Sequence, residues 1–211
     1  MERYFGRVTI ANAKKEIKKF KGFYRRAKKL KQKSFDFSKI MNTTLFIFCG
    51  IPFSGKTTLA KKLSEKFGFV RVDLDEIKFD LFGKNILDEQ IDHAGWDKVF
   101  KKIYETIEIF LKAQKTIIYD TGNFTKHERD LVRKISDKLN IQTKTIFVNT
   151  SKKTAEKRWQ ENKLSKERFD VSENDFYEAM AEMEPPDFSE NVIVYDEKDK
   201  AEDWLKVNFK N

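Results

Sequence analysis

The chain has 211 residues, of which 39% are hydrophobic and 14% aromatic, so it can form one folded domain and is too apolar to be wholly disordered. Its single cysteine, Cys49, excludes an internal disulfide and a cysteine-built zinc site, and neither a secretory leader nor an apolar run of roughly 20 residues is present, so we expect a cytoplasmic protein without a membrane span. The net charge of +9 comes entirely from residues 1–41, because the remainder carries 29 basic and 31 acidic residues.

Residues 1–41 form a basic segment with 14 Lys or Arg residues against three acidic ones. Within it, KKEIKKFKGFYRRAKKLKQK places apolar residues at steps of three and four, which predicts a basic amphipathic helix. Such a helix could contact nucleic acid or another anionic partner, dock onto the main domain, or be a poorly ordered appendage. We therefore predict two parts: a basic extension over 1–41, helical or partly disordered, and a folded domain over 42–211.

From residue 43 onward, strand-like segments alternate with helix-like ones. The strand candidates are short and rich in β-branched and aromatic residues, and they cover Thr43–Cys49, Phe69–Asp73, Thr116–Asp120, Thr143–Val148 and Val192–Tyr195. Helical periodicity occupies Lys56–Phe67, Trp96–Gln114, Lys126–Leu139, Lys152–Asn162, Glu173–Met183 and Ala201–Phe209. This alternation predicts an α/β fold, a three-layer sandwich in which helices cover both faces of a five-stranded parallel sheet.

The segment GIPFSGKT lies between the first strand and the first helix, and it matches the P-loop pattern G-x-x-x-x-G-K-[ST]. Glycines let the backbone curl so that its N–H groups point at phosphate oxygens, and the following helix presents its N-terminus to the same anion. Lys56 can reach the β- and γ-phosphates, while the Thr57 hydroxyl can ligate Mg²⁺. We expect a P-loop NTPase that binds ATP through Gly50, Pro52, Ser54, Gly55, Lys56, Thr57 and Thr58.

The strand TIIYD ends in Asp120, which suits a carboxylate that acts on Mg²⁺ directly or through water. We expect Thr57 and Asp120 to form the metal site. Thr121 stands where ATP-hydrolysing machines commonly carry a glutamate that activates water, and this disfavours dedicated hydrolysis. The sequence contains no N-K-x-D guanine-reading motif, which favours ATP over GTP.

A pair of carboxylates, Asp73 and Asp75, follows the strand Phe69–Asp73. In an open parallel sheet the ligand crevice lies at the carboxyl ends of the strands, so these acids should face the same cleft as the P-loop. Asp75 could accept the proton of an attacking hydroxyl, as the catalytic Asp of a kinase does. The alternative is that one of the two only caps the short helix DEIKFDLF. We predict Asp75 as the catalytic base, and Asp73 as a cap or as a neighbour of metal and substrate.

Two arginines, Arg158 in EKRWQENK and Arg168 in SKERFD, lie on and after the helix that follows the fourth strand. Phosphoryl transfer spreads negative charge over the equatorial oxygens, and guanidinium groups on a mobile segment can neutralise it. Ordinary solvated helix charge is the alternative. Directly after Asp120, Thr121 and Asn123 are candidates for contact with the acceptor substrate.

Together, the P-loop, Asp75, YDTGNFTKHERD and the segment before FYEAMAEMEPP resemble the P-loop kinase group that contains polynucleotide kinases, zeta toxins and chloramphenicol phosphotransferases. The resemblance covers about residues 43–209. It implies that Asp75 deprotonates the acceptor hydroxyl and that Asp120 ends the third strand. It also implies a helical lid that holds Arg158 and Arg168.

Two positions depart from these relatives. Phe53 stands where many of them carry a small residue, and Lys78 stands where polynucleotide kinases tend to have arginine. Three functions are compatible with the sequence. We expect an ATP- and Mg²⁺-dependent kinase that phosphorylates a hydroxyl of a small molecule, because the main domain offers no broad basic groove for a nucleic-acid backbone. One alternative is a kinase of the 5′-hydroxyl of DNA or RNA, with the basic segment as its grip. Another is a non-catalytic ATP-binding module.

Overall fold

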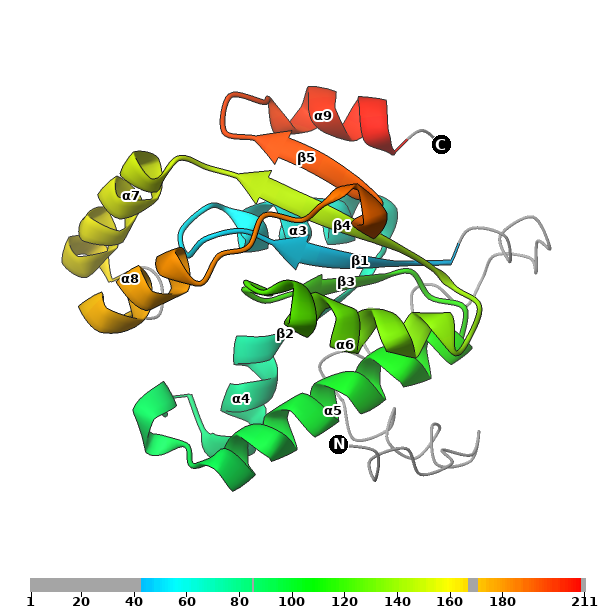
Figure 1. The fold of residues 1–211 in the computed structure, drawn as a ribbon, viewed down its shortest axis with the longest axis horizontal. Coiled ribbons are helices and arrows are strands. Elements are labelled where there is room, and N and C mark those ends of the chain that lie inside the picture. Colours follow the sequence, from blue (N-terminus) through cyan, green and yellow to red (C-terminus); the bar gives the residue numbers. More distant parts are fainter. Residues whose placement is uncertain (1–42, 85, 167–170, 210–211) are drawn as a thin grey trace. The chain divides into compact units, whose positions relative to one another are not determined.

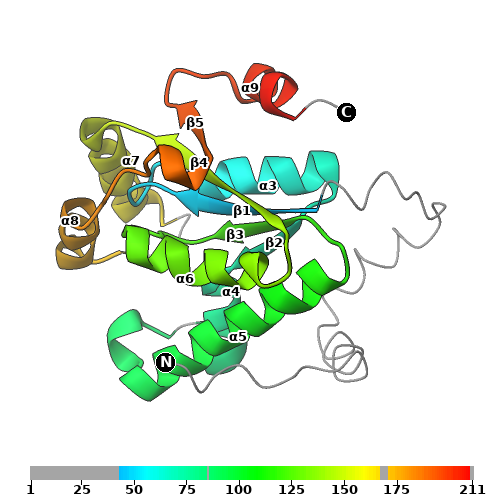
Figure 2. The same cartoon turned by 45° about the vertical axis from the view of Figure 1, so that its right-hand side comes forward.

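The computed structural model describes residues 43–84, 86–166 and 171–209. The predicted basic extension over 1–41 and the predicted lid residue Arg168 lie outside the described residues. The described part forms a five-stranded sheet of parallel strands with helices on both faces (Figures 1 and 2). The predicted α/β three-layer sandwich is therefore confirmed.

The strands lie within one residue of their predicted ends. They are β1 (Thr44–Cys49), β2 (Val70–Asp73), β3 (Ile117–Asp120), β4 (Gln142–Asn149) and β5 (Val192–Asp196), in the spatial order β2-β3-β1-β4-β5. From β1 the chain passes to the edge strand β2, returns to β3 between β2 and β1, and then crosses to the other side of β1 for β4 and β5. Because ligands of open α/β sheets bind beyond the carboxyl ends of the strands at such a reversal, the fold places the end of β1 at the expected crevice.

Six helices correspond to the periodic segments predicted above, and three further helical elements lie between them. The six are α3 (Lys56–Phe67), α5 (His93–Lys112), α6 (Lys126–Asp137), α7 (Lys152–Ser165), α8 (Glu173–Ala181) and α9 (Ala201–Asn208). The other three are α4 (Leu74–Phe82), which covers the segment DEIKFDLF, and the 3₁₀ turns η3 (Asp88–Gln90) and η4 (Phe188–Glu190). Helix α5 begins about one turn before the predicted Trp96, because the Asp92 side chain accepts the Gly95 N–H at 2.7 Å and caps it. Within the described ranges, no helix is long and apolar enough to cross a membrane.

Each face of the sheet buries its own apolar cluster. Along α5, buried residues recur every four positions at Val99, Ile103, Ile107 and Leu111, and they pack on the sheet face that holds Leu45, Ile47, Ile117 and Tyr119. The opposite face packs against α3 and α9 through a cluster of aromatic rings, which are Phe46, Phe67, Phe69, Trp204 and Phe209. Burial on both faces explains why β1 reads as an unbroken apolar run rather than an alternating one.

Helices α7 and α8 lie beyond the carboxyl ends of the strands, where a helical lid was predicted (Figure 1). The rings of Trp159 on α7 and Phe176 on α8 stack with centroids 4.6 Å apart, and this pair holds the two helices together. Phe53 of the P-loop joins the same cluster, with its ring edge-on to Phe176 at 6.1 Å. The bulky residue at position 53 thus ties the P-loop to the helix pair.

Candidate active site

The P-loop runs from Gly50, directly after β1, to Thr57 in the first turn of α3. A Cβ atom on Gly50 would lie 2.7 Å from the carbonyl oxygen of Val148, and its φ of 151° is one that other residues rarely adopt. Gly55 caps α3 with a φ of 104°. The Ser54 hydroxyl is buried and, among the described residues, is the one buried side-chain polar atom without a hydrogen-bond partner. A glycine-containing loop at a helix N-terminus, with a buried hydroxyl that has no hydrogen-bond partner, is suited to bind the phosphates of a nucleotide.

The Lys56 ammonium lies inside this loop. Its Nζ donates to the carbonyl oxygens of Gly50 at 2.7 Å and Ile51 at 2.8 Å. Burial lowers the pKa of Lys56 to about 8, and the Asp120 carboxylate opposes this effect. The ring of Phe124 faces the ammonium, with 5.9 Å between Nζ and the ring centroid. The P-loop backbone thus holds a partly buried cation where the phosphates of a nucleotide are expected.

The two residues predicted as metal ligands lie together. Thr57 Oγ1 donates a hydrogen bond to Asp120 Oδ1 at 3.3 Å. Burial raises the pKa of Asp120 to about 6, the Asp73 carboxylate adds to the rise, and Arg71 opposes it. In the described part of the chain, no group of three or more His, Cys, Asp or Glu is placed to hold a metal. One hydroxyl and one carboxylate fit Mg²⁺, which takes oxygen ligands and is usually held by one or two carboxylates together with substrate phosphates.

Arg71, on β2, connects the metal residues with the carboxylates after β2. Its Nη1 donates to Asp120 Oδ2 at 2.8 Å and also pairs with Asp73, while its Nη2 pairs with Glu76. Sequence reasoning missed Arg71. The available signal was its place two residues before Asp73, on the same side of one strand, since side chains alternate along a strand.

Asp73 and Asp75 have different surroundings. Asp73 Oδ1 accepts the Glu76 N–H at 3.1 Å and caps α4, so the capping interpretation is confirmed for Asp73. The Asp75 side chain is 54% exposed in the first turn of α4, and its Oδ1 lies 3.0 Å from Nζ of Lys78. The Lys78 side chain is 1% exposed and also donates to Asp88 at 2.5 Å. Asp75 is thus open to an incoming molecule while an ion pair orients it, and its role as a base stays a prediction.

The two residues predicted to contact substrate after β3 differ in burial. Thr121 is half-buried directly beyond the strand. Asn123 is buried, has a φ of 47°, and donates its Nδ2 to the carbonyl oxygen of Phe48 at 2.7 Å. This bond ties the β3–α6 loop to the end of β1, which accounts for Asn123 without any substrate.

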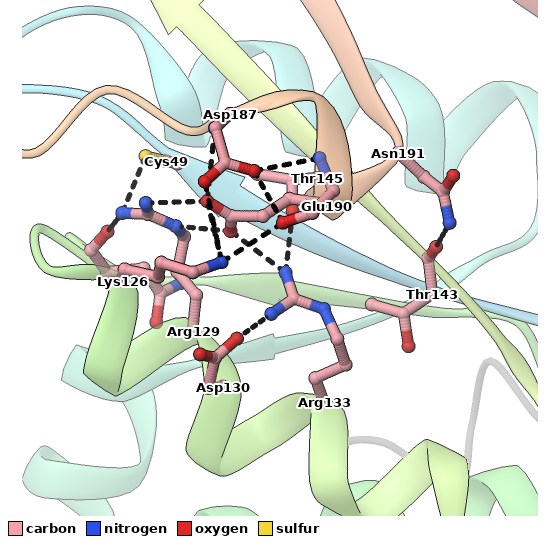
Figure 3. Close-up of polar contacts among 12 residues, drawn as sticks. Cys49, Lys126, Arg129, Asp130, Arg133, Thr143, Thr145, Asp187, Glu190 and Asn191 are labelled. Atoms are coloured by element: carbon pink, nitrogen blue, oxygen red, sulfur yellow. Dashed lines mark hydrogen bonds and ion pairs between the residues drawn. The ribbon is translucent and has the colours of Figure 1, made fainter.

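A buried ion-pair network holds the same loop (Figure 3). Arg129 on α6 donates Nε and Nη2 to the Glu190 carboxylate at 2.7 and 2.9 Å, and Nη1 to the carbonyls of Asn123 at 3.0 Å and Phe124 at 3.1 Å. Arg133 adds a bond to Glu190 at 2.9 Å. Although burial would raise the pKa of Glu190, the bonds from Arg129 and Arg133 lower it. Sequence reasoning missed this network, because charged residues on a helix read as solvated.

Arg158, on α7, reaches back to the P-loop. Its Nη1 donates to the carbonyl oxygens of Phe53 at 3.1 Å and Ser54 at 3.0 Å. The Thr150 hydroxyl donates to the Ser54 carbonyl at 2.9 Å. Arg158 also borders a pocket of about 330 Å³ that lies between the P-loop, α3, α7 and the β5–α9 connection. The predicted lid arginine therefore lies against the P-loop backbone, and its part in catalysis stays a prediction.

Comparisons with known proteins agree with this fold. The family model AAA_33, described as an AAA domain, matches residues 45–186, which is more than half of the chain. A search of curated protein sequences returns no match.

Among solved structures, the chain is similar to Kti12 of Chaetomium thermophilum in complex with ADP-AlF3, with a TM-score of 0.61 and 14% identity over 77% of this chain and 94% of that chain. It is similar to the APS kinase CysC of Mycobacterium tuberculosis in complex with AMPPNP and APS, with a TM-score of 0.55 and 17% identity over 78% and 95%. A gluconokinase from Sinorhizobium meliloti 1021 has a TM-score of 0.53 and 12% identity over 79% and 89%. Such identities show the fold alone. The chain therefore belongs to the AAA domain family AAA_33 and has the fold of the P-loop kinase group that its motifs resemble.

Proposed function

We propose that the protein is a Mg²⁺-dependent phosphotransferase that moves the γ-phosphoryl group of ATP to a hydroxyl of a small molecule. The observation that carries this proposal is the arrangement of Lys56, Thr57 and Asp120 at the carboxyl ends of β1 and β3. The β2–β3 register pairs Asp73 with Asp120, so Asp75 follows two residues beyond the same edge of the sheet. A phosphate-binding loop and an open carboxylate at one edge suit phosphoryl transfer to an alcohol.

Each group has a chemical part in this proposal. The P-loop and the N-terminus of α3 bind the phosphates, and Lys56 neutralises charge on the β- and γ-phosphates. Thr57 and Asp120 would hold Mg²⁺, which would supply positive charge to offset the negative charge of the phosphates during transfer. Asp75 accepts the proton of the acceptor hydroxyl as its oxygen attacks the γ-phosphorus and the bond to the β-phosphate oxygen breaks. The pocket beside Arg158 adjoins the P-loop and suits the nucleoside part of ATP.

A kinase of the 5′-hydroxyl of DNA or RNA is the second candidate. The concentration of positive charge in residues 1–41 favours it, since a nucleic-acid backbone binds through such charge. Two observations weigh against it: the rest of the chain carries 29 basic and 31 acidic residues, and Lys78 is buried between Asp75 and Asp88. A cation engaged in this way is poorly placed to bind an acceptor phosphate. We therefore place the small-molecule reaction first.

Asp75→Asn tests the proposed reaction. With γ-labelled ATP and a metabolite extract, we expect the wild type to transfer label to an organic product, and the variant to do so about 100-fold more slowly while it still binds ATP, because a general base contributes roughly 10²–10⁴-fold. Asp137→Asn, at the exposed end of α6 away from the P-loop, is the matched control and should leave the rate unchanged.

The other outcomes separate the alternatives. Label on a 5′-hydroxyl oligonucleotide, and on no small molecule, would favour the nucleic-acid kinase. ATP binding without transfer to any acceptor, in the wild type as in the Asp75 variant, would indicate a binding module instead.

A further inference from the structure

We propose that Arg71 is a positioning residue that excludes divalent metal from the Asp73–Asp120 pair until a nucleotide brings the metal to the Thr57 side of Asp120. The proposal rests on the proposed function, because it takes Thr57 and Asp120 as the Mg²⁺ residues. It goes beyond that function in assigning a role to a residue outside the P-loop and outside the reacting groups.

The geometry divides the two oxygens of Asp120 between two partners. Oδ1 accepts from the Thr57 hydroxyl at 3.3 Å, and Oδ2 accepts from Arg71 Nη1 at 2.8 Å. The guanidinium is planar, so its contacts with Asp73 on one side and Glu76 on the other fix its plane. Arg71 therefore sets the rotation of the Asp120 carboxylate, with Oδ1 turned toward the P-loop.

Nη1 of Arg71 occupies the position that a small cation between the two carboxylates would take. It contacts oxygens of both Asp73 and Asp120, which are register partners on adjacent strands. The side chains are largely buried, with 11% exposure for both Arg71 and Asp73 and 2% for Asp120. Two buried carboxylates facing one point would attract a divalent ion strongly if no cation stood between them, since burial weakens screening.

A resident arginine and a bound metal differ in one functional respect. Arginine stays with the protein, whereas a metal held by both carboxylates would remain after the nucleotide left. Arg71 keeps a positive charge between the two carboxylates at every stage, so the divalent ion depends on phosphate oxygens for most of its ligands and arrives and leaves with the nucleotide. This predicts metal binding that requires nucleotide in the wild type.

Arg71→Met tests this role by direct metal binding. Mn²⁺, which electron paramagnetic resonance detects when free, is titrated into the full chain at pH 8 with and without ADP. The wild type should bind Mn²⁺ only with ADP. Arg71→Met should bind Mn²⁺ without ADP, at least about tenfold more tightly than the wild type does, because a cation in contact with both carboxylates is gone.

Three further variants keep the test decisive. Arg133→Met also removes a guanidinium that joins two carboxylates, Asp130 and Glu190, but Glu190 keeps Arg129, so this variant should bind no Mn²⁺ without ADP. Arg71→Lys retains the charge and should exclude Mn²⁺ as the wild type does. Arg71→Met combined with Asp73→Asn removes one carboxylate, retains a capping side chain for α4, and should lose the new Mn²⁺ binding.

The outcomes distinguish this proposal from the proposed function. If the wild type binds Mn²⁺ with ADP but Arg71→Met does not bind Mn²⁺ in the absence of ADP, the proposed role of Arg71 is wrong and the proposed metal site stands. If the wild type binds Mn²⁺ equally with and without ADP, arginine does not exclude metal and the proposal is overturned. If neither nucleotide nor nucleotide-dependent metal binding is found, the proposed function itself fails.

Discussion

Lys56→Ala is expected to lower ATP affinity by about 100-fold. The ammonium is held inside the P-loop by the carbonyls of Gly50 and Ile51, where it would contact the β- and γ-phosphates. Hydrogen bonds to charged groups contribute roughly 1.5–3 kcal/mol each, and 1.4 kcal/mol is a factor of ten in affinity. Calorimetric titration of ATP into the two proteins measures the difference.

The matched control is Lys61→Ala, an exposed lysine on the same helix α3. Its ATP affinity should equal that of the wild type, which separates a specific loss from a general loss of positive charge. Both proteins should unfold at similar temperatures. A Lys56→Ala protein that binds ATP as tightly as the wild type would rule out nucleotide binding at the P-loop.

Arg129→Met is expected to destabilise the protein by about 3 kcal/mol, the lower end of the cost of breaking a buried ion pair, because Arg133, which is 17% exposed, still pairs with the Glu190 carboxylate. The Arg129 side chain is 0% exposed and that of Glu190 1% exposed, so water cannot replace the hydrogen bonds that the Glu190 carboxylate loses. Two carbonyls of the β3–α6 loop lose a donor at the same time. A loss of this size is a large part of the 5–15 kcal/mol that stabilises a typical domain. Urea unfolding followed by circular dichroism measures it.

The double variant Arg129→Met with Glu190→Met shows whether the incompletely paired Glu190 charge is the cause. Replacing both partners of a buried pair by apolar residues is often close to neutral, so it should recover much of the stability. Arg133→Met, which removes the more exposed partner of Glu190, should cost less than Arg129→Met because Arg129 still pairs with the carboxylate. Equal losses in the single and double variants would mean that packing, and not charge, governs this region.

Much of the fold could be predicted from local patterns. The predicted strand ends lie within one residue of the observed ones, because runs of β-branched and aromatic residues reflect the backbone preference and the burial of a short stretch of chain. The P-loop could be found because its strand, glycine-rich turn and helix follow one another directly in the chain. Asp120 could be found because it is the last residue of an apolar strand. Their meeting at one edge followed from the rule that parallel strands gather their carboxyl ends there.

The amino-acid sequence thus established the fold class, the phosphate-binding loop and the carboxylates at the sheet edge. Folding alone revealed that Asp120 shares its oxygens between Thr57 and Arg71, and that Arg129 meets Glu190 across 61 positions of the chain. The reason is that the periodicity of apolar residues and the residue preferences of turns are properties of neighbouring residues, whereas an ion pair depends on which distant segments the fold brings together. Until that convergence is known, a buried arginine cannot be told from one that faces water.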